Sequence, residues 1–212
     1  MTILTYLYGH VKNEACNSHE FFRSCDEHGY TVLNVIKAKT YMGHAQVFRE
    51  IGNAIQDLSG PIVYADAADS FFLRPINVPT DKILYSTEKA YWEPIGGEER
   101  YTDKKSRWCY LNGGGWCGPA ELVKEFYERY ALASLTGPAQ MHQHNAFFAA
   151  KADGFPIELD QLCTEFQTIA FREDDEFSTE GGVLKNLLTA TTPALIHGNG
   201  QTPMGWVYDL MP

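Results

Sequence analysis

The stretch Pro61–Asp69 reads PIVYADAAD. It begins at a turn signal, Gly60-Pro61, continues through a short apolar run and ends in two aspartates three residues apart. A short apolar run between turn signals is typical of a strand that is buried on both faces, as in a parallel sheet. The carboxyl end of such a strand is where open α/β sheets bind their ligands. The stretch therefore predicts an α/β fold with a ligand site beside Asp66.

The two aspartates, Asp66 and Asp69, permit two interpretations. Carboxylate oxygens at a strand end are suitable ligands for a hard divalent cation such as Mg²⁺ or Mn²⁺. Aspartate is also a favoured residue at the start of a helix, where its side chain accepts hydrogen bonds from the first turn. The local sequence leaves both open, and it favours Asp69 as the helix cap and Asp66 as the cation ligand.

Length and composition limit the class of protein. A chain of 212 residues, 44 % of them hydrophobic, suits one domain spanning residues 1–212. The net charge of −10 argues against a general binder of the nucleic-acid backbone. The five cysteines form no CxxC pair, which favours free thiols in a reducing compartment. With no signal-peptide pattern and no apolar run of ~18 residues, we expect a cytoplasmic protein without a membrane partner.

Apolar periodicity alternates between strand-like and helix-like segments. The expected strands are residues 2–8, 30–36, 61–65 and 83–86, and the expected helices are residues 17–28, 47–58, one after Pro119 and one around Phe147. This alternation predicts an α/β fold with a doubly wound, mostly parallel sheet flanked by helices. Residues 71–73 are expected to form a core-packing turn, and the acidic residues 173–176 a solvated loop.

Two glycine-rich segments interrupt the periodic pattern. Residues 110–118 (YLNGGGWCG) contain three consecutive glycines, which allow a backbone to turn tightly and to approach a ligand closely. A flexible connector is the alternative, although Leu111 and Trp116 are unusual for a solvated linker. Near the end of the chain, an apolar strand is followed by His197-Gly198-Asn199-Gly200, which is unusual for a turn that only reverses the chain.

These segments occur in a consistent order that is found in one known family. The matching motifs are Asp66-Ala67-Ala68-Asp69, Ser86-Thr87-Glu88 with Trp92 after it, Leu111-Asn112-Gly113-Gly114-Gly115, Leu159-Asp160 with Phe166-Gln167, and His197-Gly198-Asn199-Gly200. From about Ile62 to Gly200 the chain resembles the glycosyltransferase domain of the procollagen lysyl hydroxylases, and more loosely the collagen galactosyltransferases.

The resemblance implies a GT-A-like fold, a UDP-sugar donor and a bound Mn²⁺, with Mg²⁺ as the alternative ion. It implies that Asp66, Asp69 and His197 are the metal ligands, so that both aspartates are expected at the metal. Trp92 matches a tryptophan of the sugar pocket and is therefore a candidate catalytic residue, with core packing as the alternative. The residues expected at the donor are Tyr8 and Gly9 at the end of the first strand, Ala68, Asn112, Gly113, Gly114, Gly198, Asn199 and Gly200.

The chain departs from the family pattern at the acceptor side. The family has an acidic run before a Leu-Phe helix, and here the corresponding residues are Gln143-His144-Asn145, without a carboxylate. His144, whose pKa permits acid–base work, and Asn145 are the candidate catalytic residues; otherwise the acceptor differs or transfer is lost. The family's final Pro-Thr-Lys is replaced by Gln201-Thr202-Pro203.

The sequence therefore predicts a metal-dependent glycosyltransferase that moves a sugar from a UDP-sugar to an unidentified acceptor hydroxyl. The acceptor could be a small molecule, a glycan, a protein or a modified nucleic-acid base. A non-catalytic nucleotide-sugar-binding protein is the second hypothesis. A phosphohydrolase with an aspartate nucleophile ranks last, because Ala68 stands where such enzymes have a second acid.

Overall fold

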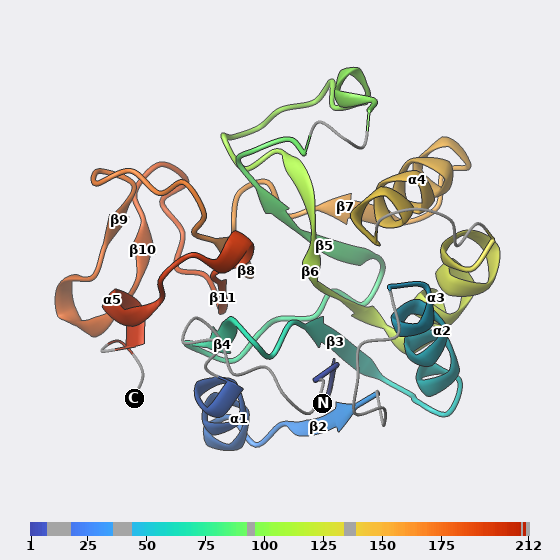
Figure 1. Cartoon of the computed structure of the whole chain (residues 1–212), viewed down its shortest axis with the longest axis horizontal. Coiled ribbons are helices and arrows are strands. Elements are labelled where there is room, and N and C mark those ends of the chain that lie inside the picture. The colour runs from blue at the N-terminus through green and yellow to red at the C-terminus, as the bar shows by residue number, and fades with distance from the viewer. Residues whose placement is uncertain (8–17, 36–43, 93–95, 134–138, 209, 211–212) are drawn as a thin grey trace.

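The computed structural model describes residues 1–212 except 8–17, 36–43, 93–95, 134–138, 209 and 211–212. In this described part, a central sheet has the strand order β2-β1-β3-β6-β5-β7 (Figure 1). Its strands are β1 (Thr2–Thr5), β2 (Thr31–Asn34), β3 (Pro61–Ala65), β5 (Ile83–Glu88), β6 (Tyr110–Pro119) and β7 (Ile157–Leu159). Strands β2, β1 and β3 are parallel, as are β5 and β7, whereas β6 is antiparallel to both of its neighbours. The mostly parallel sheet confirms the predicted fold class.

Helices cover both faces of the central sheet, as alternate residues of β3 require. Tyr64 faces the layer of α2 (His44–Ile55), α3 (Ala120–Phe126) and α4 (Ala139–Ala152), and Val63 faces α1 (Ser18–Glu27). Beyond α3 the chain forms one π-helical turn, η3 (Tyr127–Ala131). The remaining helical pieces are η2 (Glu98–Arg100), η4 (Glu180–Gly182), η5 (Asn199–Gln201) and α5 (Gly205–Tyr208). Within the described ranges, no helix has the length and apolar character needed to cross a membrane.

A smaller sheet lies beside the central one and carries the end of the chain. Its strand order is β4-β11-β8, formed by β4 (Ser70–Phe72), β11 (Leu195–His197) and β8 (Phe166–Thr168). The strands β9 (Phe177–Ser178) and β10 (Lys185–Asn186) form a separate hairpin next to it (Figure 1). Strand β11 is antiparallel to β4, and His197 pairs with Ser70, the residue that follows Asp69. This register places His197 close to Asp69.

Four local expectations differ from the structure. The glycine-rich residues 110–118 form strand β6 instead of an irregular loop, and residues 71 and 72 belong to strand β4 instead of a turn. Helix α4 begins at Ala139, so that residues 142–145 lie inside it. In the acidic run, Glu176 is fully buried and pairs with Lys89 at 2.7 Å, although the other three residues are exposed. A buried partner that is distant in sequence cannot be read from a run of charges.

Candidate metal centre and adjoining cavity

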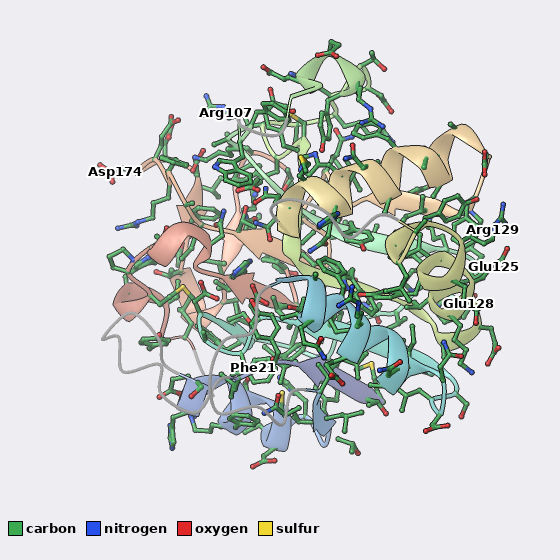
Figure 2. All side chains as sticks on the ribbon, turned by 45° about the vertical axis from the view of Figure 1, so that its right-hand side comes forward. Phe21, Arg107, Glu125, Glu128, Arg129 and Asp174 are labelled. Carbon is green, nitrogen blue, oxygen red and sulfur yellow. The ribbon has the colours of Figure 1, made fainter. Side chains whose placement is uncertain are left out.

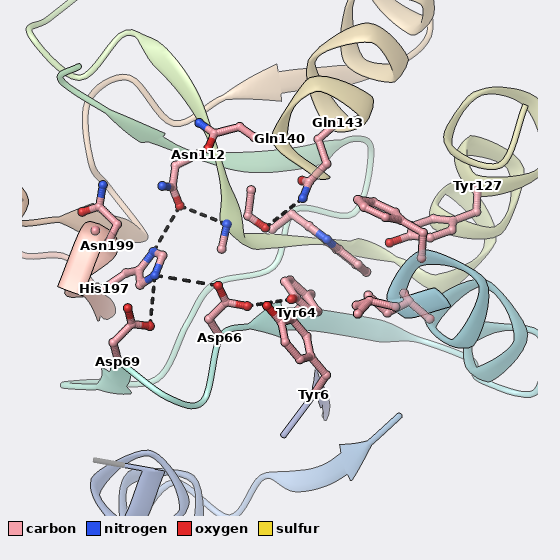
Figure 3. A pocket seen from close by; sticks show the side chains of 17 residues that line it. Tyr6, Tyr64, Asp66, Asp69, Asn112, Tyr127, Gln140, Gln143, His197 and Asn199 are labelled. Atoms are coloured by element: carbon pink, nitrogen blue, oxygen red, sulfur yellow. Dashed lines mark hydrogen bonds and ion pairs between the residues drawn. The ribbon is translucent and has the colours of Figure 1, made fainter. Parts of the chain in front are cut away.

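Asp66, Asp69 and His197 converge at the edge of the two sheets (Figure 3). His197 Nε2 lies 3.2 Å from Asp69 Oδ1 and 3.9 Å from Asp66 Oδ2. One ligand atom from each residue lies within 4.8 Å of the others. Two carboxylates and an imidazole at this spacing form a donor set that suits a divalent cation.

Backbone and side-chain hydrogen bonds fix the turn that carries the two aspartates. Asp66 N–H donates to Gly114 O at 3.0 Å, and Ala67 N–H donates to Thr5 Oγ1 at 3.1 Å. At the other end of the turn, Gly198 N–H donates to Asp69 O at 2.7 Å. Strand β4 follows directly, so Asp69 does not cap a helix, and that interpretation of the local sequence was wrong.

Asn112, on β6, holds the ring of His197 in one orientation. Its Oδ1 accepts a hydrogen bond from Gly114 N–H at 3.0 Å and lies 3.1 Å from His197 Nδ1. Because this oxygen can only accept, Nδ1 of His197 carries the proton and Nε2 faces the aspartates. Such outer partners fix the tautomer and direction of metal-binding histidines.

The charges of the three side chains are strongly linked. Burial raises the pKa of Asp66 to about 6, although His197 opposes the shift. Burial alone would lower the pKa of His197, but Asp69 and Asp66 raise it to about 9. Tyr64 O–H donates to Asp66 Oδ1 at 2.6 Å and leaves Oδ2 facing the histidine. The carboxylates thus require a positive partner, and a divalent cation fits this place.

We predict that Asn112→Ala weakens Mn²⁺ binding by about 10- to 100-fold, because the imidazole loses the acceptor that orients it. Isothermal titration of Mn²⁺ into the two proteins would measure this difference. Asn53→Ala, an exposed substitution on α2, is the matched control and should leave the affinity unchanged. Equal Mn²⁺ affinity in Asn112→Ala and wild type would contradict the role of Asn112.

A cavity of about 230 Å³ opens beside the side chains of Asp66, Asp69 and His197 and extends between the sheet and α2. Its polar end contains Asp66, Asp69 and His197 together with Asn112 and Asn199. Its other described lining residues are Tyr6, Val47, Phe48, Ile51, Tyr64, Gly113, Gly114, Trp116, Tyr127, Gln140, Gln143 and Gly200. The structure therefore gathers residues from β3, β6, β11, α2, α4, η3 and η5, together with Tyr6 just after β1, around one space.

The glycines of β6 permit close packing against the site. A Cβ on Gly114 would lie 2.1 Å from Cε1 of His197, and a Cβ on Gly113 would lie 2.3 Å from Nε2 of Gln143. Only a residue without a side chain leaves room for these groups. These glycines, which lie in a strand, thus approach two side chains closely, and their close approach to a ligand remains a prediction.

The PLOD GT domain family, which is a family of glycosyltransferase domains, matches residues 61–206. The chain belongs to this family. It is 22 % identical over 206 residues to procollagen-lysine,2-oxoglutarate 5-dioxygenase 2 of Mus musculus, covering 87 % of the chain and 28 % of that protein. This PLOD GT domain thus spans less than a third of the length of that curated relative.

Two further similarities are viral. An uncharacterized protein of Acanthamoeba polyphaga mimivirus is 26 % identical over 123 residues, which cover 58 % of this chain and 25 % of the viral protein. The crystal structure of a glycosyltransferase involved in glycosylation of the major capsid of PBCV-1 superposes with a TM-score of 0.52. That match covers 99 % of this chain and 97 % of the other at 14 % identity, so it shows a shared fold.

Only some of the predicted donor residues line the cavity of this PLOD GT domain. Asn112, Gly113, Gly114, Asn199 and Gly200 line the cavity. Ala68 lies in the aspartate turn and Gly198 binds Asp69 through its N–H, but neither is among the described lining residues. Tyr8 and Gly9 lie outside the described residues. Their roles at a donor remain predictions.

The three predicted catalytic residues are not brought to this cavity. His144 is only 2 % exposed, and its Nδ1 lies 2.6 Å from the hydroxyl of Tyr101. Asn145 is exposed and accepts a hydrogen bond from Arg100 at 3.3 Å. Trp92 is 41 % exposed, which does not fit core packing. None of them is among the described residues that line the cavity, and their catalytic roles remain predictions.

His144 provides a prediction about stability instead. Burial lowers the pKa of His144 to about 4, whereas an unfolded chain binds this proton near pH ~6.5. As the pH falls, the unfolded state takes up the proton first, so the free energy of unfolding should fall by ~2–3 kcal/mol between pH ~7 and ~4. In urea unfolding, the free energy of unfolding of His144→Gln should fall by ~2–3 kcal/mol less than that of the wild type over the same pH range.

The control for this measurement is His19→Gln, because the side chain of His19 is 80 % exposed. This control should keep the pH dependence of the wild type. If His144→Gln also kept the full pH dependence, the buried neutral state of His144 would be refuted.

Glu88, Gln140 and Gln143 are the site residues to which the sequence gave no role. Glu88, at the carboxyl end of β5, accepts hydrogen bonds from Gln140 Nε2 at 2.6 Å and from Asn199 Nδ2 at 2.9 Å. Burial raises the pKa of Glu88. A carboxylate at the end of an apolar strand, as in Asp66, was the signal that could have identified it.

Proposed function

We propose that the protein is a metal-dependent glycosyltransferase that moves a sugar from a UDP-sugar to an acceptor hydroxyl. The observation that carries the proposal is the cluster of Asp66, Asp69 and His197 at the mouth of a cavity in a glycosyltransferase-family chain. The acceptor is left open. The four described cysteines are buried free thiols, which supports a reducing compartment such as the cytoplasm.

In this proposal Asp66, Asp69 and His197 would hold Mn²⁺, which accepts an imidazole beside carboxylates more readily than Mg²⁺ does. When bound, the ion would neutralise the negative charge on the departing diphosphate. The protein's own residues supply the arrangement of the site. Asn112 keeps Nε2 of His197 directed at the aspartates, and Gly113 and Gly114 leave room for the side chains of Gln143 and His197.

One observation favours a second candidate, a nucleotide-sugar-binding protein without transfer. The carboxylates among the described lining residues are Asp66 and Asp69, which are already assigned to the metal. The lining residue Gln143 is neutral, and His144, beside it, is buried and has a lowered pKa. A side chain that could take the acceptor's proton is therefore not identified.

Thermal unfolding with a panel of nucleotide sugars, with and without Mn²⁺, separates these candidates when free UDP is assayed in the same samples. A ligand at 100 times its Kd should add about 2.7 kcal/mol of stability. A Mn²⁺-dependent shift with slow UDP release supports the transferase. A shift without UDP release, even with candidate acceptors, supports the binding protein. The absence of a shift with every donor would refute both.

A further inference from the structure

Next to the metal centre the cavity continues into an aromatic chamber, formed by Phe48, Tyr64, Trp116 and Tyr127. Tyr64 and Trp116 stack with their ring centres 5.5 Å apart and their planes at 16°. The ring centre of Tyr127 lies 6.1 Å from that of Trp116 and 6.5 Å from that of Phe48. The polar end of the cavity is thus continuous with a largely apolar space.

Tyr127 presents a polar atom in this apolar space. The residue is 1 % exposed and begins the π-helical turn η3, a feature that is frequent at functional sites. Its hydroxyl has no hydrogen-bond partner among the described residues, although buried tyrosine hydroxyls usually find one. In Figure 3 its ring reaches from η3 toward the middle of the cavity. The hydroxyl is therefore placed to bind a ligand atom.

Gln143 lies between the metal centre and the aromatic chamber. Its Nε2 donates to Gly113 O at 3.3 Å, which fixes the orientation of the amide, because only the NH₂ group can donate. Its Oε1 receives no hydrogen bond from the described residues and has almost no exposed surface, so the side chain must turn slightly for a ligand to reach this oxygen. A ligand with an N–H group would satisfy this acceptor, whose burial without a partner is unfavourable.

The position of the chamber indicates which part of a donor it takes. Its volume, with the polar end included, is about 230 Å³, below the ~300–1,000 Å³ of pockets that enclose whole ligands. A metal-bound diphosphate carries the sugar on one side and the nucleoside on the other, and the sugar is the smaller of the two groups. A sugar that carries only hydroxyls would lose their hydration against aromatic rings, at a cost that unpaired hydroxyls do not recover.

We propose that the transferred sugar is an N-acetylhexosamine whose acetamido group enters the aromatic chamber. This inference rests on the proposed function. The methyl group packs against the rings of Trp116 and Phe48, the carbonyl oxygen accepts from Tyr127 O–H, and the N–H donates to Gln143 Oε1. The edge of a nucleobase has a similar combination of donors, acceptors and apolar surface, so the experiment must separate the sugar from the base.

The test measures Kd for UDP, UDP-glucose, UDP-galactose, UDP-N-acetylglucosamine and UDP-N-acetylgalactosamine by calorimetry with Mn²⁺. At least one acetamido donor should bind about tenfold more tightly than its hydroxyl counterpart. Tyr127→Phe removes only the hydroxyl and should weaken that donor by about three- to tenfold, without changing UDP or UDP-glucose. Tyr130→Phe is the matched control. Tyr130 lies on η3, as Tyr127 does, but its hydroxyl donates to Asp153 Oδ2 at 2.9 Å.

Two results would overturn the inference while the proposed function stands. One is equal affinity for the acetamido donors and their hydroxyl counterparts. The other is a loss of UDP affinity in Tyr127→Phe as large as the loss for the acetamido donors, which would place the nucleobase in the chamber. If UDP itself fails to bind with Mn²⁺, the proposed function and the inference are both overturned.

Discussion

Asp69→Ala is expected to lower the affinity for Mn²⁺ by more than about 100-fold, since removing even an outer partner of a metal ligand costs about 10- to 100-fold. The substitution removes the carboxylate nearest to His197, at 3.2 Å, and leaves Asp66 with the imidazole. Because Asp69 lies in a surface turn with its side chain 19 % exposed, the fold should persist. Calorimetric titration of Mn²⁺, followed by donor binding, measures the loss.

Asp174→Ala is the matched control for this experiment. Asp174 is exposed on the periphery of the molecule (Figure 2), so that the same change of charge occurs far from the cavity. The control should bind Mn²⁺ and donor as the wild type does. If Asp69→Ala kept normal affinity for both, the assignment of Asp69 as a metal ligand would be wrong.

Gly114→Ala is expected to lower the affinity for Mn²⁺ by a similar factor, although it removes none of the three metal-binding side chains. The new Cβ would lie 2.1 Å from Cε1 and 2.7 Å from Nδ1 of His197, closer than any real contact. The ring must therefore turn away from the aspartates and lose its hydrogen bond to Asn112. Overpacking of this kind costs about 1–3 kcal/mol of stability. Mn²⁺ affinity and thermal unfolding are measured together.

Gly205→Ala provides the matched glycine control. No heavy atom lies within 4 Å of a Cβ at this position, which belongs to α5. Stability and Mn²⁺ affinity should both stay near their wild-type values. A Gly114→Ala protein with unchanged Mn²⁺ affinity would mean that the ring of His197 is not held in the orientation described here.

The sequence was most informative where local pattern and tertiary position agree. The apolar run of Pro61–Asp69 predicts β3, because a strand buried on both faces needs apolar residues at every position. Asp66 lies at the strand end because the apolar run stops at Ala65. The pairing of Asp69 with His197 came from the family resemblance, since no local pattern reports that β11 returns beside β4.

The features that were missed depend on neighbours that are distant in sequence. Residues 110–118 form a strand because β3 and β5 pair with them on both sides, which overrides the low strand preference of glycine. His144 is buried because Tyr101 covers it, and its spacing in the chain gave no sign of that contact. Lys89 likewise buries Glu176 from 87 residues away.

The measurement that tests the central claim most directly is calorimetric titration of UDP into the wild-type protein, with Mn²⁺ and after chelation by EDTA. We predict saturable binding with Mn²⁺, loss of binding after chelation, and recovery when Mn²⁺ is restored, because the carboxylates of Asp66 and Asp69 would repel an anionic diphosphate unless a cation lay between them. Equal binding of UDP with Mn²⁺ and with EDTA would contradict it.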